Sequence, residues 1–227
     1  MSEPVASLKN PWLSLPTESP FILPQDAAVL DRFPTEKAKL RFDALPIPYF
    51  GDPRRADVVL LTLNPAIAAE GIVAETPKET AEHRASLTFE SEPLFYPLNA
   101  EISQPYWTQR LGRLLEKLDP QVVAEHLACV EFFPYWSRTF DQLPLPVPSQ
   151  FFGFRLVEEA ATSGKLIVVL RGLKLWGLAV SNLLTAPIIV AKNPRTGAVS
   201  PGNLGSDAFD RVVRRLQAPR GQTGRPA

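Results

Sequence analysis

Apolar residues follow two patterns along the chain: short unbroken runs and positions at helical spacing. Four runs rich in Val, Ile, Leu and Phe end at Pro, Asn or Gly, which is typical of strands buried on both faces of a parallel sheet: 56–63, 128–133, 165–170 and 188–191. Apolar residues spaced three and four apart predict amphipathic helices near 107–118, 151–163, 173–184 and 206–216. Strands and helices therefore alternate along most of the chain.

This alternation predicts a three-layer α/β/α fold with a central four-stranded parallel sheet. The prediction divides the chain into a Pro-rich N-terminal arm over 1–45, an α/β domain over 46–217 and a disordered tail over 218–227. Ligands of such sheets bind at the carboxyl ends of the strands. The candidate site segments are therefore 64–65, 131–135, 171–172 and 193–195.

Composition and charge exclude several classes of protein. The chain has 227 residues, 45% of them hydrophobic, which suits one domain. Its 24 basic and 24 acidic residues cancel, so bulk charge cannot attract nucleic acid and any such contact must be local. No apolar run reaches the roughly 18 residues that a membrane span needs, and the N-terminus lacks the pattern of a secretory signal. We therefore expect a cytoplasmic protein.

Several common catalytic and binding motifs are absent from the sequence. No G-x-G-x-x-G follows the first strand, and no P-loop, G-x-S-x-G or H-E-x-x-H segment occurs. The single cysteine, Cys129, excludes an intramolecular disulfide and a zinc site built from cysteines, and we interpret it as a buried apolar residue. His83 and His126 have no nucleophile or ligand at a useful spacing, so we assign them ordinary packing or surface roles. We expect neither a metal nor a cofactor.

Two predicted strand ends carry the same dipeptide, Asn-Pro. Asn64 lies in LTLNPA, residues 61–66, and Asn193 begins NPRTGAVSPGNL, residues 193–204. The aromatic segment FYPLNAEISQPYWTQRL, residues 95–111, lies between them. In this order the three segments resemble the uracil-DNA glycosylase superfamily, nearest its mismatch-specific uracil/thymine-DNA glycosylase branch. The resemblance extends over about residues 45–217.

The resemblance implies a DNA base-excision hydrolase that acts as a monomer without metal or cofactor. Such an enzyme flips an aberrant, uracil-like or mismatched base out of single- or double-stranded DNA and cleaves its N-glycosidic bond. Asn64 would orient the attacking water, and Asn193 would donate to the departing base. Base binding is implied for Leu63, Pro65, Phe95, Tyr96, Glu131 and Phe133, and DNA contacts are implied for Lys192, Arg195, Arg138 and Arg171.

The sequence departs from the pattern of the superfamily at several positions. Thr62 and Ala66 replace the glycines that flank the first motif, and Arg195 replaces the serine of the second. Glu131 stands near the place of a base-recognising asparagine. Because an ionised carboxylate only accepts hydrogen bonds, Glu131 is either protonated in a dry pocket, or binds a donor such as an exocyclic amine, or faces elsewhere.

Other interpretations of the same residues stay open. A non-catalytic protein on this fold could bind a nucleobase, a nucleotide or DNA, and an unrelated enzyme could use the same strand ends for a small molecule. Asn-Pro is also an ordinary way for a chain to leave a buried strand. The segment FFPYWSRTF, residues 132–140, either covers the core as a loop made rigid by its proline or forms the wall of a ligand site.

Overall fold

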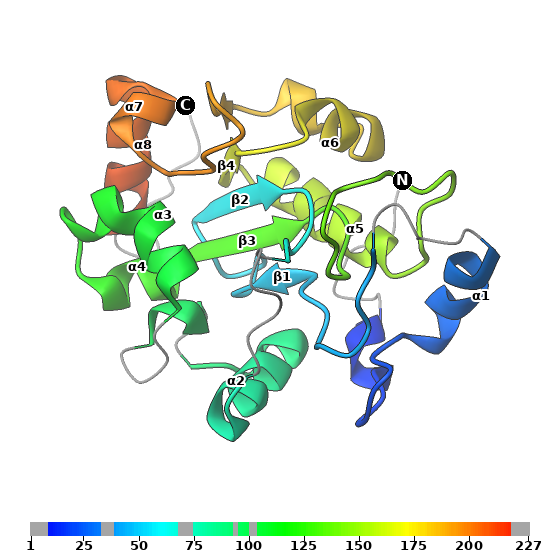
Figure 1. The fold of residues 1–227 in the computed structure, drawn as a ribbon. Helices are drawn as coiled ribbons and strands as arrows, with labels where there is room; N and C mark the ends of the chain where they lie inside the picture. Colours follow the sequence, from blue (N-terminus) through cyan, green and yellow to red (C-terminus); the bar gives the residue numbers. More distant parts are fainter. Residues whose placement is uncertain (1–8, 33–38, 68–74, 93–94, 100–103, 219–227) are drawn as a thin grey trace.

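The computed structural model describes residues 9–32, 39–67, 75–92, 95–99 and 104–218, and shows an α/β fold (Figure 1). Its described strands form one mixed sheet in the order β1-β3-β2-β4-β5. Strands β3, β2, β4 and β5 are parallel, and β1 pairs antiparallel with β3. The strands are β1 (Tyr49–Phe50), β2 (Val58–Thr62), β3 (Leu127–Glu131), β4 (Leu166–Val169) and β5 (Ile188–Val190).

The four predicted strands are thus confirmed, but the prediction of a purely parallel four-stranded sheet is wrong. Strand β1 adds a fifth, antiparallel strand at one edge. Two residues are too few to show an alternating or continuous apolar pattern, so this strand could not be identified from the sequence.

The described chain also contains α-helices and short 3₁₀ helices, and none of them is long and apolar enough to cross a membrane. The α-helices are α1 (Pro24–Arg32), α2 (Pro77–Thr88), α3 (Pro105–Leu115), α4 (Pro120–His126), α5 (Gln150–Thr162), α6 (Leu173–Ala179), α7 (Pro201–Leu204) and α8 (Ser206–Gln217). Short 3₁₀ helices are η2 (Pro11–Ser14), η3 (Tyr96–Leu98) and η4 (Leu183–Thr185).

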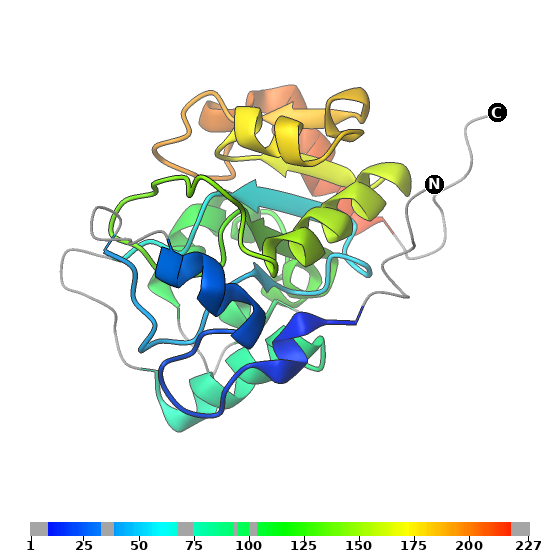
Figure 2. The same ribbon diagram turned by 90° about the vertical axis from the view of Figure 1, so that its right-hand side faces the viewer.

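The helices cover both faces of the sheet (Figures 1 and 2). Successive side chains of a strand point to opposite faces, and β2 shows this clearly. Val58 and Leu60 belong to a hydrophobic cluster with residues of α3, α4 and α8, whereas Val59 and Leu61 belong to a second cluster with residues of α5 and α6. All of β2 is buried, which explains why its sequence is an unbroken apolar run.

The helix predictions succeed where the buried face is apolar. The segments near 107–118, 151–163 and 206–216 form α3, α5 and α8, while the segment 173–184 divides into α6 and η4 because Val180 adopts an extended conformation. Helix α2 was not predicted, because its buried face carries His83 and Ser86 beside Leu87. A capping box formed by Thr76 and Glu79 was the available signal for its start.

The described part of the Pro-rich segment packs against the α/β domain. Trp12 and Leu23 are buried in the cluster on the α5 and α6 face. Buried Asp26 of α1 accepts hydrogen bonds from the Tyr135 hydroxyl at 2.7 Å and from the Ser149 amide at 2.9 Å. These bonds connect α1 to the segment after β3 and to the start of α5, so the N-terminal region holds that segment in place.

Candidate functional site

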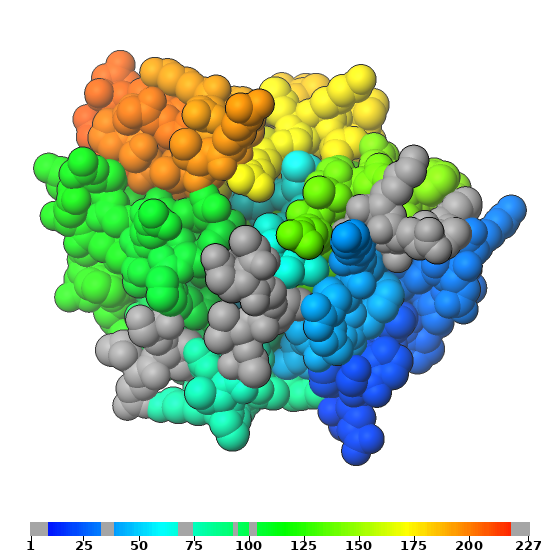
Figure 3. Space-filling model, in the orientation of Figure 1, coloured from blue at the N-terminus to red at the C-terminus, as the bar shows by residue number. Residues whose placement is uncertain are grey.

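The four segments predicted to form a site follow the carboxyl ends of the parallel strands. Thr62 at the end of β2 pairs in register with Glu131 at the end of β3. Arg171 follows β4, and Asn193 follows β5. Figure 3 shows cyan atoms, the colour of the residues around β2, recessed below the yellow segment near the centre of the view. We call Asn64, Tyr106, Arg110, Glu131 and Arg171 the carboxyl-edge cluster.

The Asn64 side chain is half-buried just beyond β2 and is held through its nitrogen. Nδ2 donates to the Pro65 carbonyl at 3.0 Å and to the Ser137 hydroxyl at 2.8 Å. Within the described part of the chain, nothing donates to Oδ1. The amide is therefore fixed in orientation while its oxygen stays available as an acceptor, which is the arrangement needed to position a water molecule.

Asn193 is exposed and opens a tight turn after β5. Its Oδ1 accepts from the backbone amide of Arg195 at 3.0 Å, and its own amide donates to Asn203 Oδ1 at 2.8 Å. This side-chain turn is typical of asparagine. The remaining side-chain donor is Nδ2, the group that the predicted role at the departing base requires.

Two arginines hold the turn of residues 193–196 against the edge of the sheet. Arg171 donates from Nε to the Pro194 carbonyl at 2.7 Å and from Nη2 to the Arg195 carbonyl at 2.9 Å. Arg110 Nη1 donates to the Thr196 carbonyl. These contacts indicate that Arg171 positions the turn, since two of its five N–H donors bind the backbone there.

Glu131 is buried, with 8% of its surface exposed, on the face of the sheet covered by α3. Its neighbours in the strand, Val130 and Phe132, belong to the cluster on the opposite face, which fixes the direction of Glu131. Burial raises the pKa of the carboxyl to about 7, although hydrogen bonding by Thr62 and the charges of Arg171 and Arg110 act to lower it. The sequence left three alternatives for Glu131: protonated in a dry pocket, bound to a hydrogen-bond donor, or facing elsewhere. The burial of its carboxyl favours the first.

One oxygen of this carboxyl lacks a hydrogen-bond partner. Oε2 of Glu131 is buried and unpartnered among the described residues. The Thr62 hydroxyl has a single hydrogen and lies 3.2 Å from the Val130 carbonyl and 3.4 Å from Cys129 Sγ, so Glu131 competes with both for it. Neither Arg110 nor Arg171 forms an ion pair with Glu131 within 4.0 Å. A buried polar atom without a partner is costly unless a bound molecule supplies one.

Sequence reasoning missed Tyr106 and Arg110 at the start of α3. The Arg110 guanidinium carbon lies 4.0 Å from the centre of the Tyr106 ring, and Tyr106 is 47% exposed. Burial of the hydroxyl raises the pKa of Tyr106, Glu131 raises it further and Arg110 opposes the shift, so the three groups influence one another. Their four-residue spacing at the start of a helix was a usable signal, because such residues share one face.

Phe95 and Tyr96 lie in the core, with 0% and 1% of their surfaces exposed. The Phe95 ring packs edge-on against Trp107 at 5.0 Å, and the rings of Phe95 and Tyr96 lie 5.8 Å and 5.6 Å from that of Phe50. The prediction that they stack on a flipped base is therefore wrong. Phe50 of the unpredicted strand β1 completes the aromatic packing that encloses them.

Leu63 and Pro65 stabilise the end of β2. Leu63 packs with the cluster on the α5 and α6 face, so it points away from Glu131. Gly172 has a φ of +74° and makes room for Leu63, because a Cβ at this position would lie 2.4 Å from Leu63 Cδ2. Pro65 is buried, and its carbonyl accepts from both Asn64 Nδ2 and the Ser137 amide. The contacts of both residues are structural.

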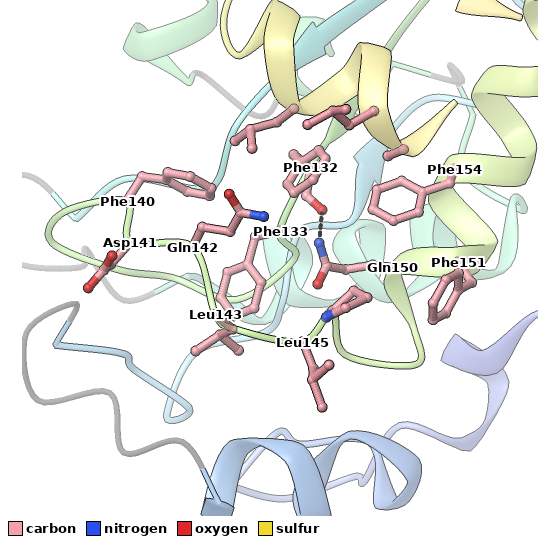
Figure 4. A pocket seen from close by; sticks show the side chains of 14 residues that line it. Phe132, Phe133, Phe140, Asp141, Gln142, Leu143, Leu145, Gln150, Phe151 and Phe154 are labelled. Carbon is pink, nitrogen blue, oxygen red and sulfur yellow. Dashed lines mark hydrogen bonds between the residues drawn. The ribbon is translucent and has the colours of Figure 1, made fainter. Parts of the chain in front are cut away.

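Phe133 lines an apolar cavity of about 290 Å³ between the segment after β3 and helices α5 and α6 (Figure 4). Phe132 and Phe154 contribute to its wall, and Gln150 crosses it to donate to the Phe132 carbonyl at 2.7 Å. Placing Phe133 beside Glu131 as a base-binding residue is therefore wrong, because the α5 and α6 face lies on the other side of the sheet. The segment 132–140 both covers the core and forms a cavity wall.

The remaining predicted DNA contacts, Lys192, Arg195 and Arg138, are exposed. All three follow carboxyl ends of strands, so their charges lie around the same edge as the cluster. His, Cys, Asp and Glu side chains form no group of three or more that could hold a metal ion in the described ranges.

Comparison with protein-family models, with curated proteins and with solved structures finds no match to this chain. What the protein does must therefore be inferred from the geometry of the carboxyl edge.

Proposed function

We propose that the chain is a base-excision glycosylase resembling the uracil-DNA glycosylase superfamily, which hydrolyses the N-glycosidic bond of a flipped base. The observation that carries this proposal is the Asn64 amide, whose nitrogen is tied to Pro65 and Ser137 while its oxygen is left as an acceptor. It stands beyond the end of β2, the strand that pairs in register with Glu131 of β3. Together they offer one group for a water molecule and one for a base.

In the proposed reaction the bond between C1′ and the base breaks, and its electron pair leaves with the base. The sugar passes through an oxocarbenium-like state, as in glycoside hydrolysis, and the water held by Asn64 Oδ1 adds at C1′ and loses a proton to solvent. The departing base takes up a proton from solvent, so the products are a C1′ hydroxyl and a neutral base. An amide has no pKa near neutrality, so Asn64 positions the water without acting as a general base. Nδ2 of Asn193 donates to the base where negative charge grows, a contact worth roughly 3–4 kcal/mol in comparable sites.

The aromatic contact to the base is assigned to Tyr106. With Phe95 and Tyr96 in the core, Tyr106 is the ring of the carboxyl-edge cluster that remains exposed. Arg110 lies over its ring, so the base would stack on the rest of the aromatic surface. Stacking of this kind is worth about 1–3 kcal/mol for each base and does not depend strongly on base identity.

The proposed partner is single- or double-stranded DNA that contains an aberrant base. Lys192, Arg195 and Arg138 are exposed cations around the carboxyl edge that can contact phosphates. Because the whole chain has a formal charge of zero, these few residues must supply the local attraction. Binding should therefore weaken with salt, with a slope that reflects only a small number of phosphate contacts.

The test is release of a base from labelled oligonucleotides that contain uracil or a mismatched thymine, followed by alkaline cleavage at the abasic site. Asn64→Ala should abolish release. Asn182→Ala is the matched control, because Asn182 Nδ2 also donates two bonds, to the Glu158 carbonyl at 3.1 Å and to the Thr162 hydroxyl at 2.8 Å. Asn182 precedes β5 and lies at the other end of the sheet, so this variant should keep full activity.

Two results would refute the enzymatic proposal. Absence of base release from all DNA substrates, with salt-sensitive DNA binding retained, would identify a binding protein on the same fold. Loss of both would favour an enzyme that acts on a small molecule. Retained activity in Asn64→Ala would remove the role assigned to that residue.

A further inference from the structure

Exposed hydrophobic side chains surround the apolar cavity on the α5 and α6 face. Leu145, Phe151 and Leu178 line it, with 48%, 54% and 76% of their surfaces exposed. They are three of the seven large hydrophobic residues that are exposed in the described part of the chain. Single exposed apolar residues are common on proteins, whereas a group of them gathered around a cavity is typical of a binding site.

Contacts with the core hold the walls of this cavity in place. The Phe154 ring lies 5.1 Å from that of Phe132 and 6.0 Å from that of Phe151. Gln150 is buried, donates to the Phe132 carbonyl at 2.7 Å and accepts from the Val147 amide at 2.9 Å. The apolar site is therefore formed by the protein's own contacts before a ligand binds.

The volume and lining of the cavity limit what it can hold. An engineered apolar cavity of about 150 Å³ binds benzene, so a volume of about 290 Å³ suits an apolar group of roughly ten carbon atoms. Asp141 is the one charged residue in the described lining. Figure 4 shows Asp141 and Phe151 at opposite ends of the cavity. A negatively charged group on the ligand would therefore lie toward Phe151, away from the acid.

Phe151 also lines a second cavity, of about 510 Å³, between the start of α5 and the N-terminal segment that contains η2 and α1. Lys9 and Arg155 line this cavity, and none of its described lining residues is acidic. Lys9 is exposed and forms no ion pair within the described ranges. Arg155 pairs with Glu158, which does not line the cavity. The second cavity therefore offers positive charge next to the apolar one.

We infer that the two cavities together bind a small amphiphilic anion, a carboxylate that carries an apolar chain or ring system of roughly ten carbon atoms. The apolar part fills the first cavity, the carboxylate lies near Lys9 and Arg155 in the second, and Phe151 packs against the ligand between them. This site goes beyond the proposed glycosylase, because the α5 and α6 face lies on the other side of the sheet from Glu131.

Other ligand chemistries use only part of this surface. A neutral hydrocarbon fills the apolar cavity without contacting the cations, and a small polar anion contacts the cations without burying apolar surface. A cationic amphiphile would bring its charge next to Lys9 and Arg155, which would repel it. A carboxylate can pair with an ammonium and accept two bonds from a guanidinium, so it matches the second cavity.

The test titrates octanoate, octanamide and acetate against the whole protein and follows the backbone amide signals by two-dimensional NMR. Octanoate and octanamide share one chain, and only octanoate is charged. We expect octanoate to bind about fivefold more tightly than octanamide, the upper range for an exposed ion pair, and to be the more sensitive to salt. Acetate lacks the chain and should not bind at the same concentrations. The signals that shift should belong to α5, α6 and residues 140–146.

Variants then separate the two parts of the site. Leu178→Gln should weaken binding of octanoate and octanamide alike, by about threefold to tenfold, because apolar contact is lost. Lys9→Gln should weaken octanoate alone and bring its affinity to that of octanamide. Leu184→Gln and Lys117→Gln are the matched controls, since both residues are exposed and neither lines either cavity. Their affinities should equal that of the original protein.

Equal binding of octanoate and octanamide, or octanoate binding unchanged by Lys9→Gln, would overturn the inference. So would binding unchanged by Leu178→Gln, shifts confined to other parts of the molecule, or no binding of either ligand. Asn64→Ala should bind octanoate as the original protein does. Loss of base release in that variant with octanoate binding retained would therefore keep the two proposals separate, and failure of one leaves the other standing.

Discussion

The burial of Glu131 predicts a specific dependence of stability on pH. In the folded protein the pKa of this carboxyl is about 7, against an ordinary value of 4.5. Each unit of difference corresponds to about 1.4 kcal/mol, so the shift of between two and three units amounts to about 3 kcal/mol. The folded state binds the proton more tightly than the unfolded state. Its stabilising contribution is therefore present below about pH 4.5 and is lost as the pH rises through about 7.

Replacing Glu131 with Gln removes this titration and keeps the shape of the side chain. The free energy of unfolding of Glu131→Gln minus that of the original protein should therefore rise by about 3 kcal/mol between pH 4.5 and pH 8.5. Taking the difference cancels the contribution of the other titrating groups. The measurement is urea unfolding followed by tryptophan fluorescence at several pH values, with the m-value checked for constancy.

Glu116→Gln is the control for this experiment. Glu116 is exposed and paired with Arg113. The free energy of unfolding of Glu116→Gln minus that of the original protein should therefore vary by no more than about 0.5 kcal/mol over the same pH range. If the difference in free energy of unfolding between Glu131→Gln and the original protein also did not change with pH, the Glu131 carboxyl would titrate in the folded protein as it does in water. The assignment of Glu131 to a dry pocket would then be wrong.

Three further predictions concern the structure around the site. Tyr135→Phe should lower the free energy of unfolding by about 1–3 kcal/mol in urea titrations, because the Tyr135 hydroxyl donates to buried Asp26 and accepts from the Leu23 amide. Arg171→Met should speed hydrogen exchange of the amides in the turn 193–196, since two bonds to its carbonyls are lost; unchanged exchange would contradict the positioning role. Leu178→Gln should change the free energy of unfolding measured in urea by no more than about 0.5 kcal/mol, because Leu178 is 76% exposed.

Several features of this protein follow from its sequence alone. The four apolar runs predicted strands, and β2 to β5 lie where those runs predict. Strands β2, β3 and β4 are buried along their whole length, whereas β5 is only partly buried. Periodicity identified α3, α5 and α8 for the same reason, since each has an apolar buried face. The carboxyl ends of parallel strands that alternate with helices lie at one edge of the sheet. The positions of Asn64, Glu131 and Asn193 at that edge could therefore also be predicted from the sequence.

Only the tertiary structure decided how individual side chains at that edge are used. Aromatic residues such as Phe95 suit both a core and a stacking platform, and the unpredicted strand β1 encloses them in the core. The direction of Glu131 depends on strand register, in which a shift of one residue reverses the face. Tyr106 and Arg110 lie on the same side of the sheet as Glu131 because α3 packs on that face, and each of them influences or is influenced by its charge. Hydrophobic patterns record which residues are buried, whereas the partners of a buried polar atom are set by contacts between segments distant in the chain.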